Sequence, residues 1–322
     1  MTPPTNATDL PIVRPCGEAA TAAGAALIRA GQPVAVPTET VYGLAADATD
    51  SDAVARIYAA KGRPSFNPLI VHVADMAMAE LLGMFGDAER RLAAVLWPGP
   101  LTLVVPRRAD CPVASLATAG LDTIALRVPA HRAMQALIAA SGRPLAAPSA
   151  NASGAISPTR AVHVAASLAG RIALVIDDGP CAAGLESTIA RVVDGRIVVL
   201  RPGPVTPEQL AEVSGLPVVA AGEGPVIAPG QLASHYAPTK PLRLEAVDFT
   251  ADEWGIGFGA VDGDDNLSPS GNLVEAAARL FDALHRADAS AKPRIAAAAV
   301  PDEGLGAAIN DRLRRAAAPR GV

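Results

Sequence analysis

Short apolar runs alternate along this chain with segments in which apolar residues recur every three or four positions. The runs have the length and the Val, Ile and Leu content of buried strands, whereas the periodic segments have the spacing of amphipathic helices. Strands are expected at 33–36, 69–73, 101–105, 123–128, 144–147, 172–177, 242–246, 255–260 and 294–300. Helices are expected at about 18–30, 51–61, 75–84, 87–96, 131–140, 207–213, 272–286 and 305–317. Strands that alternate with helices in this way favour an α/β fold with a mixed sheet.

Cap and turn residues mark the ends of several elements. Ser51 or Asp52 is expected to cap the second helix, whose last turn carries Lys61 and which Gly62 ends. The Asp-Gly pair at 194–195 predicts a two-residue turn between two antiparallel strands. The sheet therefore needs some antiparallel pairing beside its parallel strands.

A Gly- and Pro-rich stretch predicts two domains. The expected order is a tail at 1–15, a first domain at 16–214, a linker at 215–241 and a smaller α/β domain at 242–322. The linker contains His235, Tyr236 and Lys240, which a plain spacer does not need. Tyr236 has two open interpretations, since the segment either packs against the domains or folds over a bound ligand as a lid.

Composition narrows the class of protein. The formal net charge of −5 and a pI near 5.6 argue against a protein that coats nucleic acid through bulk charge. Three scattered cysteines argue against a disulfide framework and against a cysteine zinc site. The N-terminus lacks a secretory pattern, and no apolar run approaches the roughly 20 residues of a membrane helix. We therefore expect a cytoplasmic protein that does not cross a membrane.

The segment PTETVYGL at 37–44 and the segment KGRPSFNPLIVH at 61–72 concentrate hydrogen-bond donors between apolar runs. Such a density of donors indicates the wall of a small-anion site, and the small-residue loop PSANASG can bring backbone N–H groups to an anion as well. Common alternatives are missing from the sequence: it has no P-loop and no G-x-S-x-G elbow, and its histidines are dispersed. GIGFGA at 255–260 lacks the full dinucleotide-binding spacing, so close packing is the expected reason for its glycines.

Seven ordered motifs carry a resemblance to a known family. They are PTETVYGLAADA, KGRPSFNPLIVH, WPGPLTLV, TAGLDTIALRVP, APSANASGAISPT, LESTI and LRPG. Over about residues 18–205 the chain closely resembles the YrdC/Sua5 family of threonylcarbamoyl-AMP synthases. APGQLASHYAPTKPL, followed by a small α/β domain, is similar to the longer two-domain Sua5 form. The resemblance implies a twisted mixed sheet whose helices form a basic cavity, plus a smaller Rossmann-like C-terminal domain.

The same resemblance implies a reaction. L-threonine, bicarbonate and ATP would give threonylcarbamoyl-AMP and diphosphate, and the product would serve the t6A modification at position 37 of tRNA. Mg²⁺ would accompany the ATP, with no ligand from a protein side chain. The product would pass to a downstream threonylcarbamoyl-transferase complex, and any binding of tRNA itself would be weak.

Residue roles follow from the motifs by resemblance. The implied catalytic set is Lys61, Arg63, Ser149 and Asn151. The implied ATP side is this set together with Asn67, Thr123, Ser157, Arg201 and Tyr236. The implied threonine side is Thr38 or Thr40, His72, Arg127 and Ser187, with Arg127 pairing the carboxylate of threonine.

Each of these residues also has a structural interpretation. Lys61 and Arg63 suit a solvated helix end, His72 suits a core, Arg127 suits an internal ion pair, and one of the two threonines is expected to cap a turn.

Two rival functions remain open beside the synthase. One is a module that binds double-stranded RNA or tRNA, which the acidic net charge weakens. The other is a related carbamoyl-adenylating enzyme of hydrogenase maturation. Those proteins carry acylphosphatase and zinc-finger-like modules, for which this chain has neither the length nor the cysteines.

Overall fold

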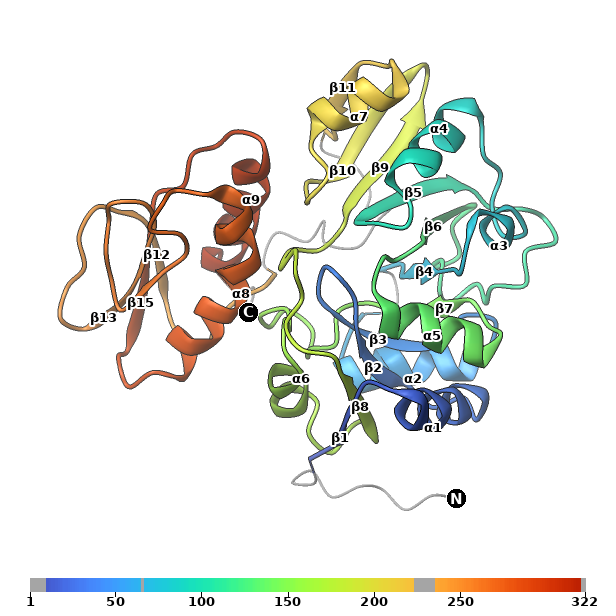
Figure 1. Cartoon of the computed structure of the whole chain (residues 1–322), viewed down its shortest axis with the longest axis horizontal. Helices are drawn as coiled ribbons and strands as arrows, with labels where there is room; N and C mark the ends of the chain where they lie inside the picture. Colours follow the sequence, from blue (N-terminus) through green and yellow to red (C-terminus); the bar gives the residue numbers. More distant parts are fainter. Residues whose placement is uncertain (1–9, 65–66, 223–234, 320–322) are drawn as a thin grey trace.

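The computed structural model describes residues 10–64, 67–222 and 235–319. Two sheets organise them into a larger and a smaller unit (Figure 1). In sheet order, the larger sheet contains β1 (Ile12–Pro15), β8 (Leu174–Asp177), β2 (Val34–Pro37), β3 (Tyr42–Asp47), β7 (Leu145–Ala146), β4 (Ile70–His72), β6 (Thr123–Arg127), β5 (Leu101–Pro106), β9 (Thr188–Val193), β10 (Arg196–Arg201) and β11 (Val218–Ala220). The smaller sheet contains β12 (Leu242–Ala246), β15 (Arg294–Ala298), β13 (Glu253–Gly257) and β14 (Asp265–Asn266).

The larger sheet is mixed and the smaller sheet is parallel, as the predicted α/β class requires. The helices of the larger unit are α1 (Glu18–Arg29), α2 (Ser51–Lys61), α3 (Met76–Glu80), α4 (Asp87–Leu96), α5 (Arg132–Ser141), α6 (Ala161–Ser167) and α7 (Pro207–Ser214). The helices of the smaller unit are α8 (Leu273–Ala289) and α9 (Leu305–Ala317). The predicted turn at Asp194 and Gly195 joins β9 to β10, and both residues have positive φ.

Some predicted boundaries were wrong. Residues 12–15 form β1, which pairs with β8, and are not part of a tail. Strand β3, buried along its whole length, was not predicted, and β11 lies inside the predicted linker, where it pairs with β10. The expected helix at 75–84 ends at Glu80, because the chain then turns and Gly83 forms a β-bridge with Arg107. The remainder of the linker, 223–234, lies outside the described residues.

Helix α2 illustrates how the sequence sets an element. Its cap is Asp50, not Ser51 or Asp52, since the Asp50 carboxylate accepts hydrogen bonds from the backbone N–H groups of Asp52 and Ala53. Gly62 ends the helix as predicted, in the left-handed conformation with φ 59°. The helix therefore delivers Lys61 at its last turn.

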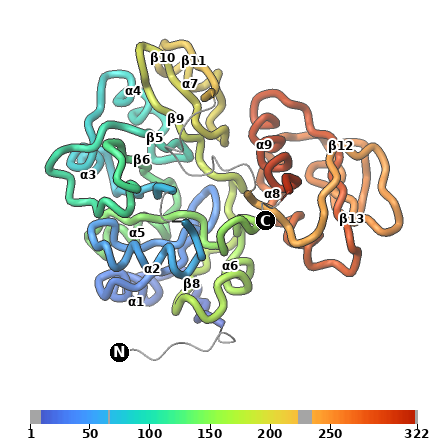
Figure 2. Tube along the Cα trace, turned by 180° about the vertical axis from the view of Figure 1, so that it is seen from behind, coloured from blue at the N-terminus to red at the C-terminus, as the bar shows by residue number. Residues whose placement is uncertain are grey.

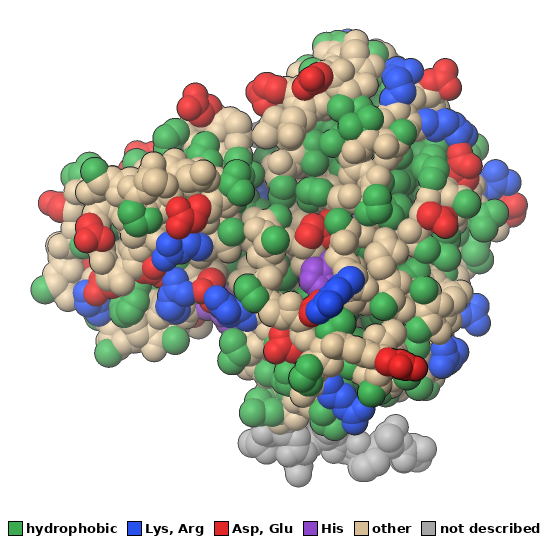
Figure 3. Space-filling model, viewed as in Figure 1, with side chains coloured by type: hydrophobic (Ala, Val, Ile, Leu, Met, Phe, Trp, Pro, Cys, Tyr) green, Lys and Arg blue, Asp and Glu red, His purple; other side chains and the backbone are tan. Residues whose placement is uncertain are grey.

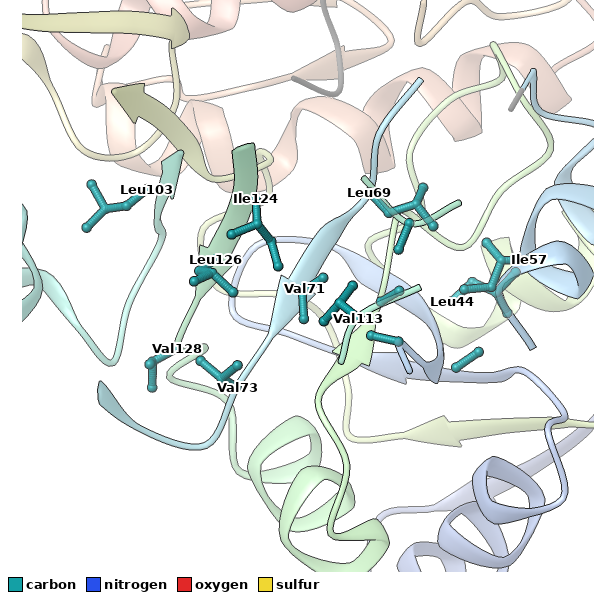
Figure 4. Packing of buried hydrophobic residues seen from close by; sticks show 14 of the residues in the cluster. Leu44, Ile57, Leu69, Val71, Val73, Leu103, Val113, Ile124, Leu126 and Val128 are labelled. Atoms are coloured by element: carbon teal, nitrogen blue, oxygen red, sulfur yellow. The ribbon is translucent and has the colours of Figure 1, made fainter. Parts of the chain in front are cut away.

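The core of the larger unit lies between its sheet and helices. Figure 4 shows Val71, Leu126 and Leu103 side by side on β4, β6 and β5, with Ile57 of α2 packed near Leu44 of β3. All five side chains are buried, and aliphatic contacts of this kind hold the strands in register. The sheet thus gives the polar residues at its strand ends a rigid support.

The smaller unit packs against the larger one through its helices. In Figures 1 and 2, α8 and α9 lie between the small sheet and the larger unit. Its apolar cluster includes Val41, Ile156 and Leu185, which belong to the larger unit. No described helix has the length and apolar character needed to span a membrane.

Two of the three glycines of GIGFGA serve close packing, as expected, whereas Gly259 has open space around it and a positive φ of 58°. A side chain at Gly255 would collide with the ring of Phe249, and one at Gly257 with the carbonyl of Val261. The strand there is β13, which ends at Gly257 and not at residue 260 as predicted.

Candidate active site

A pocket in the larger unit gathers polar side chains from segments far apart in the sequence. The loop between β2 and β3, the ends of β4 and β6, the loop after β7 and the start of β9 contribute to its wall. The predicted side chains in this wall are Thr38, Thr40, Arg63, His72, Arg127, Ser149, Ser187, Arg201 and Tyr236. The wall also contains Glu186 and His235, which the sequence analysis did not assign to the site.

The other predicted site residues do not line this pocket. They are Lys61, Asn67, Thr123, Asn151 and Ser157. Lys61 and Ser157 lie directly behind the wall, since Lys61 bonds to Ser149 and Ser157 bonds to Glu186. Thr123 begins β6, whereas the wall residue Arg127 ends it, so this strand separates the two predicted residues.

Lys61 is a buried cation in a cage of carbonyl groups. Its Nζ donates hydrogen bonds to the backbone carbonyls of Ser149 and Asn151, and the residue is only 2% exposed. Burial, reinforced by the charge of Arg63, lowers the pKa of Lys61 well below its ordinary value. No carboxylate forms an ion pair with Lys61 among the described residues, so an anionic ligand would stabilise its charge.

Arg63 is held by the loop that follows it and keeps donors available. One terminal nitrogen, Nη2, donates to the carbonyl of Pro68 at 3.2 Å, while Nε has no partner among the described residues. Burial lowers the pKa of Arg63 to about 10, so the guanidinium remains charged at neutral pH. The alternative interpretation of Lys61 and Arg63 as a solvated helix end does not hold, because both side chains are buried.

The two threonines of the β2–β3 loop have different roles. Thr38 caps the turn, since its hydroxyl donates to the carbonyl of Val41 at 2.7 Å and accepts from the backbone N–H of Thr40. The hydroxyl of Thr40 accepts a hydrogen bond from Nη1 of Arg127 at 3.0 Å. The expectation that one of the two threonines caps a turn is confirmed.

Arg127 has an internal partner that the sequence analysis missed. Its Nη2 lies 2.6 Å from Oε1 of Glu39, and its Nε donates to the carbonyl of Gly99 at 3.2 Å. Burial raises the pKa of Glu39, but the charge and hydrogen bond of Arg127 outweigh it, and the net pKa is lowered. Glu39 stands inside the PTETVYGL motif between the two threonines, so its position in that motif was the available signal.

His72 is a neutral donor or acceptor on the pocket wall. Burial, with the nearby charge of Arg127, lowers the pKa of His72 to about 3. Its Nδ1 has no hydrogen-bond partner among the described residues. A neutral imidazole with a free nitrogen can hydrogen-bond to a polar ligand. It is less suited to pairing with a strongly acidic ligand group, which favours a charged partner.

Ser187 is held from two sides. Its hydroxyl lies 2.7 Å from that of Thr102, and Arg201 donates to both its hydroxyl and its carbonyl. These bonds fix the backbone at the start of β9, where the wall passes from Glu186 to Ser187. The serine is therefore a rigid part of the pocket.

Glu186 links the pocket to the C-terminal unit. Its Oε1 accepts from the hydroxyl of Ser157, and its Oε2 accepts from Nε of Arg312 at 2.8 Å. Burial raises the pKa of Glu186, but Arg312 and Arg201 outweigh it, and the net pKa lies below the ordinary value. Glu186 belongs to the LESTI motif, which the sequence analysis quoted without giving the glutamate a role.

Buried polar atoms without protein partners cluster around this pocket. Among the described residues they include Arg63 Nε, Asn67 Oδ1, His72 Nδ1, Asn151 Oδ1, His235 Nδ1 and Tyr236 Oη. Buried polar groups are nearly always hydrogen-bonded in folded proteins, so these atoms await water or a ligand. With three arginines in the wall and Lys61 behind it, the pocket favours an anion that also offers hydroxyl or amino groups.

Comparison with known families accounts for most of the chain. The Sua5/YciO/YrdC family profile, described as "Telomere recombination", matches residues 26–203, and the profile described as "Threonylcarbamoyl-AMP synthase, C-terminal domain" matches residues 205–318. The threonylcarbamoyl-AMP synthase of Bacillus subtilis is 44% identical over 324 residues, which cover 93% of each chain. The enzyme of the same name from Pyrococcus abyssi is 40% identical over 319 residues, covering 92% of this chain and 93% of that one.

Solved structures agree with this assignment of the fold. Pyrococcus abyssi Sua5 complexed with L-threonine is 37% identical, has a TM-score of 0.85 and covers 96% of this chain and 97% of its own. Full-length HypF in its phosphate- and nucleotide-bound form is 19% identical with a TM-score of 0.51. The match covers 58% of this chain and 30% of HypF, and it shows a shared fold alone.

Proposed function

This chain belongs to the YrdC/Sua5 family of threonylcarbamoyl-AMP synthases, and from that premise we propose how its pocket carries out the reaction. The enzyme is a nucleotidyltransferase that joins L-threonine, bicarbonate and ATP into threonylcarbamoyl-AMP with release of diphosphate. Its product serves the t6A modification of tRNA. The observation that carries the proposal for the site is the ring of unpartnered polar atoms around a pocket with three arginines.

The chemistry explains why the pocket is basic. The carbamate that forms on the amine of threonine must attack the α-phosphorus of ATP, and both reactants are anions. A site for this step neutralises the repulsion and aligns the two groups. Arg63, Arg127 and Arg201 supply fixed positive charge on the wall, and Lys61 supplies it from behind the Ser149 loop.

We place the phosphates of ATP beside Lys61 and Arg63. The other protein residues of the implied ATP side would surround the nucleotide. The free Nε of Arg63 favours this placement, whereas the free Oδ1 of Asn151 is an acceptor and suits a hydroxyl or amino group of the nucleotide. The implied ATP side also contains Ser149, Asn67, Thr123, Ser157, Arg201 and Tyr236. Within it, Ser157 acts through Glu186, and Thr123 has the weakest claim because the pocket wall does not include it.

We place threonine at the opposite wall, beside Thr40, His72, Arg127 and Ser187. The complex of Pyrococcus abyssi Sua5 with L-threonine favours a threonine site in a chain of this fold. Arg127 already bonds to Glu39, Thr40 and Gly99, yet a guanidinium has five N–H groups, so one on each terminal nitrogen remains for a carboxylate. Thr38 shapes the loop instead of binding substrate, since its hydroxyl caps the turn.

We also propose that Mg²⁺ enters with the phosphates of ATP. Among the described residues no group of three His, Cys, Asp or Glu side chains could hold a metal ion. Glu186 is the carboxylate among the described wall residues, and it is already bonded to Ser157 and Arg312. The residues of the wall therefore fit a Mg²⁺ ion that is held by the phosphate oxygens of ATP and screens their charge.

The proposal extends to the setting of the enzyme. We propose a cytoplasmic protein of two domains, in which the junction of the two family profiles between residues 203 and 205 favours a division near the end of β10, earlier than the expected boundary at 214. Because the product is unstable, we propose that it passes directly to a transferase complex. Binding of tRNA would be weak, since acidic and basic side chains are interspersed on the face shown in Figure 3.

The test is release of diphosphate by purified protein with ATP, Mg²⁺ and bicarbonate, with and without L-threonine. We expect release that requires threonine and falls by about two to three orders of magnitude in Lys61→Ala, as when a charged contact to a transition state is removed. Lys292→Ala is the matched control, because Lys292 lies on the surface of the smaller unit in an ion pair with Asp264. Turnover that is independent of threonine, or unchanged in Lys61→Ala, would refute the proposed site.

A further inference from the structure

The helix α9 of the smaller unit places one arginine directly behind the wall of the pocket. Arg312 is fully buried, and each of its nitrogens is engaged. Nε donates to Glu186 at 2.8 Å, Nη2 donates to the carbonyl of Pro202 at 2.9 Å, and Nη1 donates to Asp311 at 2.6 Å. Two of these partners belong to the larger unit, so Arg312 ties the smaller unit to the loops on both sides of the β9–β10 hairpin.

The same guanidinium also contacts Tyr236. It lies 5.3 Å from the centre of the tyrosine ring, within the range of a cation–π interaction. Tyr236 lines the pocket with a buried hydroxyl that has no partner among the described residues, and its ring packs against Phe281 of α8. Arg312 therefore reaches two wall residues, Glu186 and Tyr236, from outside the larger unit.

Close packing keeps α8 and α9 in place behind this wall. A side chain at Gly184 would come within 2.4 Å of the backbone carbonyl of Ala277 in α8, so the two backbones almost touch. Leu185, the next residue, belongs to the apolar cluster of the smaller unit. The position of α9 and the position of Glu186 are thus determined together.

The Glu186 carboxylate needs a cation in this setting. It is 5% exposed, and a buried carboxylate is costly unless it is paired and hydrogen-bonded. Arg201 also lies near it, but the side chain of Arg201 donates its hydrogen bonds to Ser187. Arg312 is the cation that bonds to Glu186 directly among the described residues.

We propose that Arg312 is a positioning residue of the synthase reaction, which holds the Glu186 carboxylate and the Tyr236 ring in the pocket wall and makes the site depend on the docked C-terminal unit. The inference rests on the proposed function. Arg312 itself does not line the pocket, so it acts through these two residues and not by contact with substrate. A displacement of about 1 Å in a reacting site can cost on the order of a hundredfold in rate.

The test compares Arg312→Met with Arg314→Met in the diphosphate assay. Arg314 stands on the same helix, but its side chain is 60% exposed and pairs with Asp302 on the surface. We expect kcat/KM to fall about a hundredfold in folded Arg312→Met and to stay at the wild-type value in Arg314→Met. Arg312→Lys keeps the charge beside Glu186 but not the three separate contacts, so it should recover part of the loss.

A pH profile separates positioning from mere stability. The titratable groups that face Glu186 are Arg312 from α9, Arg201 from β10, and the neutral His235 and Tyr236 from the segment before β12, while Asp311 pairs with Arg312. Removal of Arg312 raises the pKa of Glu186, so the carboxylate is protonated at higher pH and activity on the acid side is lost earlier. The double variant E186Q/R312M has no carboxylate at this position and should not show that shift.

The outcomes decide between the alternatives. Equal kcat/KM for E186Q and E186Q/R312M, beside a large loss in Arg312→Met, means that Arg312 acts through Glu186. If Arg312→Met does not fold, the same two variants carry the test, because a neutral pair of similar volume is tolerated where a lone buried charge is not.

A folded Arg312→Met with wild-type kcat/KM and an unchanged pH profile would overturn the proposal. So would a further hundredfold loss on adding R312M to E186Q/Y236L, in which Arg312 has neither the carboxylate nor the ring to hold. Calorimetric titration with ATP, compared across the same variants, does not need turnover. A wild-type protein that binds ATP in an Arg312-dependent way but releases no diphosphate would count against the proposed function alone.

Discussion

Lys61 is buried away from water, and we predict that it takes up a proton when ATP binds. Burial holds the pKa of Lys61 well below its ordinary value, whereas bound phosphates would raise it. At a pH between these two values ATP binding takes up a proton, so ATP affinity falls as pH rises, by at most about tenfold per pH unit. Calorimetry in two buffers of different ionisation enthalpy, repeated over a series of pH values, measures that proton.

Lys61→Met should abolish this proton uptake, and Lys292→Met, on the surface, should leave it intact. Uptake that persists in Lys61→Met would place the titrating group elsewhere.

Gly203 supplies a second prediction at the scale of one residue. A Cβ there would come within 2.5 Å of the backbone nitrogen of Thr188 and 2.6 Å of the carbonyl of Glu186. Gly203→Ala should therefore cost about 1–3 kcal/mol of unfolding free energy and weaken threonine binding, because the backbone on both sides of Ser187 must shift. Gly17→Ala, where nothing lies within 4 Å, is the matched control for urea unfolding. Equal stability of the two variants would contradict the close approach.

At the scale of the element, the cap of α2 determines where Lys61 is presented. Asp50→Ala removes the side chain that accepts from two backbone N–H groups of the first turn, and should cost about 1 kcal/mol of unfolding free energy. Asp52→Ala, in the first turn of the same helix, should cost no more than about 0.5 kcal/mol because its side chain is not the cap. Urea unfolding measures both, and a larger loss in Asp52→Ala would mean that the cap is assigned wrongly.

Elements whose signals are local were the ones that the sequence predicted. Gly62 ends α2, and Asp194 with Gly195 turns the β9–β10 hairpin, because each needs a backbone conformation that few residues adopt. Strands β1 and β11 depend instead on pairing with β8 and β10, and their own residues give no signal of that pairing. Strand β3 is buried on both faces and shows no alternation.

The residues of the site also divide into those with a local sequence signal and those without one. The quoted motifs contain most of the residues that line the pocket, Arg63 among them, as well as Lys61 directly behind it. The Glu186–Arg312 pair joins positions 126 residues apart, one inside a motif and one in a helix outside all of them. Only the packing of the two units brings such a pair together, so sequence patterns alone could not reveal it.

At the scale of the whole molecule, the contact between the two units runs from the pocket wall to α6. Behind α8 the rings of His285 and His163 stack with centroids 3.8 Å apart, and His285 Nε2 lies 3.1 Å from the carbonyl of Ser157. Asp282 of α8 bonds to Arg160 across the same interface. The C-terminal unit is thus fixed to the segment that carries Ser157 by polar contacts as well as by apolar packing.

This interface predicts that the folded protein weakens in acid. Burial, with the neighbouring His163, lowers the pKa of His285 to about 4, whereas an unfolded histidine titrates near 6.5. Between these values the unfolded chain binds more protons, so stability is complete above about pH 6.5 and falls as pH decreases, on the order of 1 kcal/mol per pH unit for this histidine. His72 and His235, both with pKa lowered to about 3 by burial, add losses of the same sign.

Urea unfolding at about pH 7.5 and at about pH 5 measures the total effect. His285→Gln cannot take up that proton, so its stability should change less between the two pH values than that of the wild type. The groups that face His285 are His163, Asp282 and Asp288, and the two aspartates limit the loss because they favour its protonated form. If His285→Gln loses as much stability in acid as the wild type, the interface histidine is not among the groups that weaken the fold, and the loss must come from other groups, such as His72, His131 and His235, whose pKa burial also lowers.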